Sequence, residues 1–224
     1  GAIGMGVGKL NLPGRPGDMP TKQAAAAVGQ CELMYTYDRL FLAYNHTVAQ
    51  VLLTGEDVDH PERRENFENT MERLLELGAL PIINENDTIA TAEIKVGDND
   101  TLGAIVACCV RADLLVLLSD IEGLYTADPR KDPAATLIPV VEEVTPDIEA
   151  LAGGVGSSLG TGGMATKLRA AKMVTAQGCD MVITNGERPD RLYDIAQGKA
   201  DFGGVAAVLR MTTTLCVTSV PGTV

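Results

Sequence analysis

The chain has 224 residues, of which 46% are apolar and 24 are glycine, so it can bury a large core as one α/β domain. Its net charge of -12 argues against nucleic acid as a partner, because nucleic-acid-binding proteins need a basic surface. No apolar run reaches the roughly 18 residues of a membrane span, and the start lacks a signal-peptide pattern. We therefore expect a cytoplasmic protein without membrane contacts.

Helical and strand patterns alternate along the chain, which predicts parallel βαβ units. The predicted helices are residues 21–44, a helix from Pro61 that Gly78 closes, and residues 102–110, 146–152, 165–177 and 192–197. The predicted strands are residues 47–53, 80–83, 114–118, 137–141 and 181–184. The continuous apolar run at 114–118 indicates a strand covered by helices on both faces.

Cysteine and histidine do not suggest a disulfide framework or a metal site. The odd number of cysteines and the lack of a Cys-x-x-Cys pair predict reduced thiols, mostly in the core. They are Cys31, Cys108, Cys109, Cys179 and Cys216. His46 and His60 lack the spacing of metal ligands, so we expect both to be structural.

The most informative segment is Ile83–Asp100, INENDTIATAEIKVGDND, which places Asn and acidic side chains around a lysine behind a predicted strand. Polar side chains at the carboxyl end of a buried strand are where open α/β sheets bind ligands. The segment therefore predicts a substrate loop. An Asn/Asp-rich surface loop is the alternative.

A second segment, Ser157–Lys167 (SSLGTGGMATK), places glycines directly before a helix with a lysine in its first turn. Backbone N–H groups, the positive helix end and the ammonium together favour a polyphosphate. It is not a Walker A loop, because no Gly-Lys-Ser/Thr closes it. A third glycine-rich stretch, Gly4–Lys9, superficially suggests a dinucleotide fingerprint, but no strand precedes it and Pro13 and Pro16 follow.

The segment Ser119–Arg130 (SDIEGLYTADPR) follows the most apolar strand. It resembles the nucleotide loop of the amino acid kinase superfamily, although an ordinary turn with Asp-Pro chemistry is the alternative. The loop at 83–100 closely resembles the signature loop of the bacterial glutamate 5-kinase family. That resemblance implies an amino acid kinase fold, a mainly parallel sheet sandwiched between helices. It also implies ATP-dependent phosphorylation of the L-glutamate side-chain carboxylate to glutamyl 5-phosphate, the first step of proline biosynthesis.

The resemblance also implies a substrate site. Its expected residues are Asp87, Asn99, Asn84, Asn86, Asp98, Gly1, Ala2 and Lys95. Asp87 and Asn99 would hold the α-amino and carboxylate groups, since Asp and Asn together supply the acceptors and donors that a zwitterion needs. Gly1 and Ala2 match the end of a Ser-Gly-Ala motif that closes on the substrate in the family. Lys95 would meet phosphate or carboxylate, or is an exposed, solvated lysine.

For the nucleotide, the resemblance implies contacts in the two other loops. The expected residues are Ser119, Asp120, Tyr125, Asp128, Thr161, Gly162, Gly163, Met164, Ala165, Thr166 and Lys167. Lys167 would stabilise the transferring charge, and Asp100 would organise the catalytic lysines. Glutamate, with a reference pKa near 4.3, is ionised at neutral pH and needs no general base. Mg²⁺ would bind with ATP, without a dedicated protein metal site.

The resemblance runs from Gly1 to about Ala200, so residues 1–200 are expected to form an amino acid kinase domain, with a divergent tail of uncertain structure at 201–224. The family's opening βα unit and its phosphate-contacting lysine are missing, which predicts a fragile chain without turnover. Family partners are L-glutamate, ATP and proline as feedback inhibitor, and a homo-oligomer is expected. Two alternatives remain: a truncated chain that binds glutamate or proline without catalysis, and a sister kinase for another acid, against which the substrate loop argues.

Overall fold

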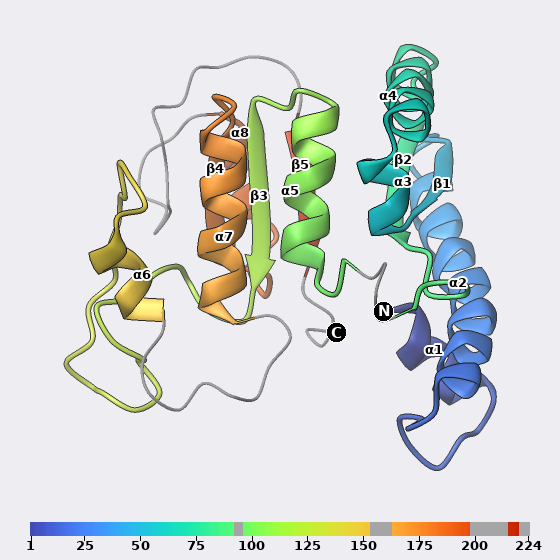
Figure 1. The fold of residues 1–224 in the computed structure, drawn as a ribbon, viewed down its shortest axis with the longest axis horizontal. Helices are drawn as coiled ribbons and strands as arrows, with labels where there is room; N and C mark the ends of the chain where they lie inside the picture. The colour runs from blue at the N-terminus through green and yellow to red at the C-terminus, as the bar shows by residue number, and fades with distance from the viewer. Residues whose placement is uncertain (92–95, 153–162, 198–214, 220–224) are drawn as a thin grey trace. The chain divides into compact units, whose positions relative to one another are not determined.

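The structure, a computed structural model, describes residues 1–91, 96–152, 163–197 and 215–219 (Figure 1). Its contacts divide the chain into two compact units, Gly1–Val96 (unit 1) and Gly97–Val224 (unit 2). No helix of the described residues is long and apolar enough to cross a membrane. The predicted domain boundary near residue 200 lies outside the described residues and stays a prediction.

Unit 1 is built on a two-stranded parallel sheet. Its elements are α1 (Ala2–Lys9), α2 (Met19–Leu42), β1 (Val48–Leu53), α3 (Gly55–Asp59), α4 (Pro61–Glu76) and β2 (Leu80–Glu85). In the sheet Val48 lies opposite Leu80, and Leu53 lies opposite Glu85. The Asp18 carboxylate caps α2 by accepting the Thr21 N–H at 2.9 Å, which is the usual role of an N-cap side chain.

The glycine-rich start forms a helix that the sequence did not predict. α1 packs against α2 so closely that a Cβ atom added to Gly6 would lie 1.8 Å from the Ala25 carbonyl oxygen. A Cβ atom on Gly29 would lie 1.7 Å from the Ala2 carbonyl oxygen. Glycine at these two positions is therefore required by backbone packing, not by a phosphate.

Unit 2 contains a three-stranded parallel sheet with strand order β4-β3-β5. Its elements are α5 (Asn99–Cys109), β3 (Leu114–Ser119), α6 (Pro146–Ala152), α7 (Met164–Thr175), β4 (Asp180–Asn185), α8 (Arg191–Ala196) and β5 (Leu215–Ser219). Figure 1 shows β3 between α7 and α5, with β4 behind α7. The predicted tail thus supplies an edge strand, β5, which pairs with β3 along Leu114–Leu118.

The core of unit 2 has two layers because β3 and β4 are apolar on both faces. Leu115 and Leu117 of β3, with Met181 and Ile183 of β4, pack in one cluster with side chains of α5 and α7. The alternate residues of the same strands form a second cluster with Ile195 of α8: Leu114, Val116 and Val182. Helices therefore cover both faces, which confirms the predicted parallel sheet between helices.

Some predicted elements were wrong. Residues 137–141 do not form a strand: only an isolated antiparallel bridge joins Leu137 to Tyr125, and Pro139 interrupts the possible ladder because it has no N–H. The short helix α3 was missed. Cys108, Cys109 and Cys179 are buried as expected, but Cys31 is exposed.

Candidate active site

The amino ends of α5 and α7 form a polar site in unit 2. Asp98 is the N-cap of α5, and its carboxylate accepts the Thr101 N–H at 2.7 Å and the Thr101 hydroxyl at 2.9 Å. Gly163 is the N-cap of α7, and its carbonyl accepts the Thr166 hydroxyl at 2.7 Å. Two helix amino ends, each with positive partial charge, are thus held by short local hydrogen bonds.

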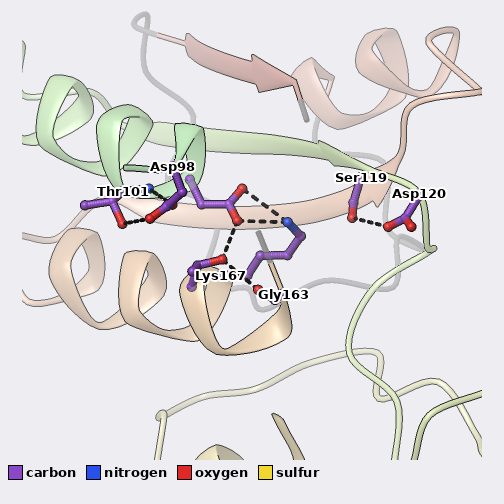
Figure 2. Close-up of polar contacts among 8 residues, drawn as sticks. Asp98, Thr101, Ser119, Asp120, Gly163 and Lys167 are labelled. Carbon is purple, nitrogen blue, oxygen red and sulfur yellow. Dashed lines mark hydrogen bonds and ion pairs between the residues drawn. The ribbon is translucent and has the colours of Figure 1, made fainter. Parts of the chain in front are cut away.

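A buried ion pair joins these two helix ends (Figure 2). The Lys167 ammonium donates to Asp100 Oδ2 at 2.9 Å and to Oδ1 at 3.2 Å, and both side chains are 3% exposed. The Thr166 hydroxyl also lies 2.7 Å from Asp100 Oδ2. A buried charge is tolerated only when it is paired and hydrogen-bonded, which these three side chains achieve together.

This arrangement fixes where the positive charge lies. An ammonium has three N–H donors, and two of them point to the Asp100 carboxylate, so one remains for a ligand. Because Asp100 and Lys167 lie in the first turns of α5 and α7, the Lys167 ammonium is held at the positive amino ends of both helices. The geometry suits a bound phosphate, which all these groups favour.

Ser119 is the last residue of β3 and Asp120 follows it, and Figure 2 draws both in the same view as the ion pair. The Ser119 hydroxyl donates to the Asp120 carboxylate at 3.2 Å, and Arg130 forms an ion pair with the other carboxylate oxygen. Burial alone raises the pKa of Asp120, but the hydrogen bond and charge of Arg130 outweigh it, so the pKa lies below its ordinary value. Asp120 is therefore held as a carboxylate.

The segment after Asp120 folds back on itself. Leu124 is buried in the core of unit 2, and Tyr125 bridges to Leu137. The Asp128 carboxylate accepts the Arg130 N–H at 3.0 Å and pairs with Lys131 at 3.6 Å. Asp128 thus stabilises a turn in this structure, and a nucleotide contact by Tyr125 or Asp128 stays a prediction.

In unit 1, the start of the predicted substrate loop lies at the end of β2. Asn84 is the last residue but one of β2, and the Asn86 N–H donates to the Leu53 carbonyl at 2.7 Å, which continues the ladder to β1. The Asn86 side chain accepts the Thr88 hydroxyl, and the Ala90 N–H donates to the Asn86 carbonyl at 3.0 Å. Asn86 therefore shapes a tight turn, and Asp87 lies half-buried within it.

Two buried polar residues of unit 1 were not predicted. Glu85 is 8% exposed, and its carboxylate accepts the Val96 N–H at 2.5 Å, so it joins residues on both sides of the loop. Gln30 of α2 is 7% exposed and hydrogen-bonds to Asn84 and Gln50. A polar residue four positions after Ala26, on an otherwise small and apolar helix face, was the available signal.

The remaining predicted site residues have the following places. Gly1 is the exposed N-cap of α1 and Ala2 is buried, whereas Met164 is half-buried and Ala165 is exposed at the start of α7. Lys95, Thr161 and Gly162 lie outside the described residues. Asn84, Asn86 and Asp87 belong to unit 1, and Asp98, Asn99 and Asp100 to unit 2. No cluster of three metal-ligating side chains occurs within residues 1–91, 96–152 and 163–197.

Comparison with known families agrees with this fold. The model of the amino acid kinase family matches residues 4–185. The chain therefore belongs to the amino acid kinase family. Among curated relatives it is 54% identical, over 200 residues, to the glutamate 5-kinase of Clostridium tetani, which covers 89% of this chain and 75% of that protein. It is also 54% identical to the glutamate 5-kinase of Myxococcus xanthus, covering 91% of this chain and 54% of the longer relative.

Solved structures give the same fold at low sequence identity. The T. acidophilum isopentenyl phosphate kinase aligns with a TM-score of 0.57 and 17% identity, over 90% of this chain and 77% of that one. The carbamate kinase of Giardia lamblia aligns with a TM-score of 0.59 and 14% identity, over 97% and 82% of the two chains. At such identities the likeness concerns the fold alone, and the choice of substrate depends on the closer relatives.

Proposed function

We propose that this chain carries ATP-dependent glutamate 5-kinase activity, the phosphorylation of the L-glutamate side-chain carboxylate to glutamyl 5-phosphate, as the first step of proline biosynthesis. The observation that carries the proposal is the buried Asp100–Lys167 pair at the amino ends of two helices. The identity of 54% to curated glutamate 5-kinases supports the choice of substrate.

The chemistry requires positioning and positive charge more than a base. The glutamate carboxylate is already ionised at neutral pH and attacks the γ-phosphorus of ATP directly, displacing ADP. Lys167 stabilises the charge on the transferring oxygens, and Asp100 holds its ammonium in place. The start of α7, from Gly163 to Ala165, contributes backbone N–H groups to the phosphates.

The remaining predicted residues complete the proposal. Asp87 and Asn99 hold the amino acid, with Asn84, Asn86, Asp98, Gly1, Ala2 and Lys95 around it. Ser119, Asp120, Tyr125 and Asp128 contact the nucleotide, together with Thr161 and Gly162. The carboxylate chemistry of Asp87 suits the substrate ammonium, and the amide of Asn99 suits its carboxylate.

We propose Mg²⁺ as the cofactor, bound with ATP. The three described carboxylates near this site have other partners: Asp98 caps α5, Asp100 pairs with Lys167 and Asp120 pairs with Arg130. Since these three are already engaged, the ATP phosphates and water would be the main ligands, as is usual for Mg²⁺. The ion would neutralise phosphate charge. We further propose proline as a feedback inhibitor, a homo-oligomeric state and a cytoplasmic location.

The test measures ATP-dependent trapping of the product as hydroxamate, with L-glutamate and, separately, L-aspartate as acceptor. Residues 1–224 joined to the family's opening βα unit should form hydroxamate from glutamate only, and none when EDTA removes Mg²⁺. Calorimetric titration with glutamate and with a non-hydrolysable ATP analogue measures binding independently of turnover. Glutamate binding without hydroxamate would identify a non-catalytic amino acid-binding chain, and preference for another acid would indicate a sister kinase.

A further inference from the structure

A chain of three side-chain amides crosses unit 1 from β1 through α2 to β2. Gln30 Nε2 donates to Gln50 Oε1 at 3.0 Å, and Asn84 Nδ2 donates to Gln30 Oε1 at 2.9 Å. Asn84 Oδ1 in turn accepts the backbone N–H of Glu85 at 3.0 Å. Gln30, the middle member, is only 7% exposed, so its two hydrogen bonds replace contacts that water would otherwise make.

The backbone N–H of Glu85 sets the direction of the whole chain. A backbone donor cannot be reversed, so Asn84 must face it with its oxygen and present its NH₂ group to Gln30. Gln30 must then face Asn84 with its oxygen and turn its own NH₂ group to Gln50. If Asn84 were flipped, its NH₂ group would meet the Glu85 N–H, donor against donor, in a partly buried place where the mismatch costs most.

We propose that Gln30 is a positioning residue of the amino acid site: it holds the Asn84 amide in one orientation, so that Asn84 offers its second N–H to a carboxylate of the substrate. One N–H of Asn84 is used by Gln30, and its oxygen is used by the Glu85 N–H. The remaining N–H is a donor of fixed direction. This inference rests on the proposed function, because it takes Asn84 as a residue of the glutamate site.

A fixed donor matters because orientation costs entropy. Without Gln30, the Asn84 side chain would have to be ordered when the substrate binds, and that cost would weaken affinity. The effect should appear in glutamate binding and leave nucleotide binding unchanged. A merely structural role of Gln30 would lower the stability of unit 1 without acting through Asn84.

The test is a double-mutant cycle read by calorimetry, in which Asn84→Ala is made in the parent chain and in Gln30→Met and Gln30→Glu backgrounds. Methionine keeps the length of Gln30 but removes both hydrogen bonds, whereas glutamate keeps an oxygen facing Asn84. We expect Asn84→Ala to weaken glutamate binding about tenfold in the parent and in Gln30→Glu, and less than about threefold in Gln30→Met. The glutamate Kd with Asn84→Ala is divided by the Kd without it in the same background, which removes the effect of the added charge in Gln30→Glu.

A stability control separates positioning from folding. Met71→Ala opens the core of unit 1 at a residue of α4 that is 4% exposed and is not a member of the amide chain, so it should lower the melting temperature without changing the loss of glutamate affinity caused by Asn84→Ala. The inference would be overturned if Asn84→Ala weakened glutamate binding by the same factor in the parent and in Gln30→Met, or had no effect in the parent. Glutamate phosphorylation would stand in either case. A parent chain that binds ATP but not glutamate would instead overturn the proposed function. If Gln30→Met does not fold, the inference would be overturned equally if Asn84→Ala no longer weakened glutamate binding about tenfold in the Gln30→Glu background.

Discussion

The two units bury their polar groups by different physical means. Unit 2 buries opposite charges, Asp100 and Lys167, beside strands that are apolar on both faces. Unit 1 buries neutral amides and a carboxylate that accepts a backbone N–H, represented by Gln30 and Glu85. Charge acts over distance and suits a phosphate, whereas amides act only through oriented hydrogen bonds and suit the selection of an amino acid.

The comparison predicts that breaking the charge pair of unit 2 has the largest effect on the protein. Lys167→Met leaves Asp100 buried without its counter-ion, which should lower the free energy of unfolding by about 3 to 5 kcal/mol. Where the parent turns over glutamate, loss of this preorganised cation should also lower turnover about 10²- to 10³-fold. Urea unfolding and the hydroxamate assay measure the two effects.

A matched variant separates stability from catalysis. Asp100→Asn combined with Lys167→Met removes both charges, so most of the lost stability should return while turnover stays low. If Lys167→Met alone keeps near-normal turnover and stability, the lysine is only a helix-end charge. The proposed difference between the units, a buried charge pair in unit 2 and buried amides in unit 1, would then have no functional meaning.

The next largest effect concerns Asp87 and Asn99, which we propose to hold the zwitterion. Asp87→Ala or Asn99→Ala should weaken glutamate binding roughly tenfold or more, since a charge-assisted hydrogen bond contributes about 1.5 to 3 kcal/mol. ATP binding, measured by the same calorimetry, should barely change. Asn69→Ala, at an exposed asparagine of α4, is the control. Unchanged glutamate affinity in either variant would remove that residue from the site.

The third prediction tests the glycine packing of unit 1. Gly29→Ala would place a methyl group 1.7 Å from the Ala2 carbonyl oxygen, so α1 must shift, and we expect a loss of about 1 to 3 kcal/mol in unfolding free energy. Gly4 lies in the same helix α1, but nothing lies within 4 Å of an added Cβ there, so Gly4→Ala should stabilise by about 0.5 to 1 kcal/mol. Thermal unfolding of both variants measures the two changes in stability. If both variants were stabilised, or both destabilised, the close approach of α1 and α2 would be contradicted.

The sequence predicted the helices and strands that are marked by a local run of apolar residues. The apolar runs of β3 and α5 are local signals, so both elements were predicted, although α5 begins at Asn99 and not at the predicted Leu102. The strand at 137–141 was wrong because Val and Ile there are local cues, whereas a strand needs a partner and Tyr125 provides only one bridge.

Contacts between distant residues have no local signal in the sequence. Only the family resemblance implied that Asp100 organises the catalytic lysines, because its pairing with Lys167 joins positions 67 residues apart. The partnership of Gln30 with Asn84 joins positions 54 apart, and no local pattern encodes it. The glycines of α1 were first compared with a phosphate loop, because a tight helix contact and a phosphate contact both require a residue without a side chain.

The smallest predicted effect concerns Asp120 and Arg130, a charge pair of unit 2 that is exposed, unlike Asp100 and Lys167. Arg130 lowers the pKa of Asp120 against the effect of burial, so the pair stabilises the folded state above the unfolded pKa of about 3.9 and loses that contribution as the pH falls through the lowered folded pKa. Arg130→Gln should therefore cost less than about 1 kcal/mol at pH 7, and the difference from the parent should vanish below the folded pKa.

Urea unfolding of the parent and Arg130→Gln between pH 7 and pH 3 measures this difference, and 1 M salt at pH 7 should reduce it as well. Lys131→Gln is the control, because Lys131 pairs with Asp128 at 3.6 Å and 72% of its side chain is exposed, so its loss should change stability even less. A stability difference for Arg130→Gln as large as that for Lys167→Met, and equally large at pH 3, would show that exposure does not separate the two charge pairs. The physical contrast holds only if the buried pair dominates and the exposed pair fades with acid and salt.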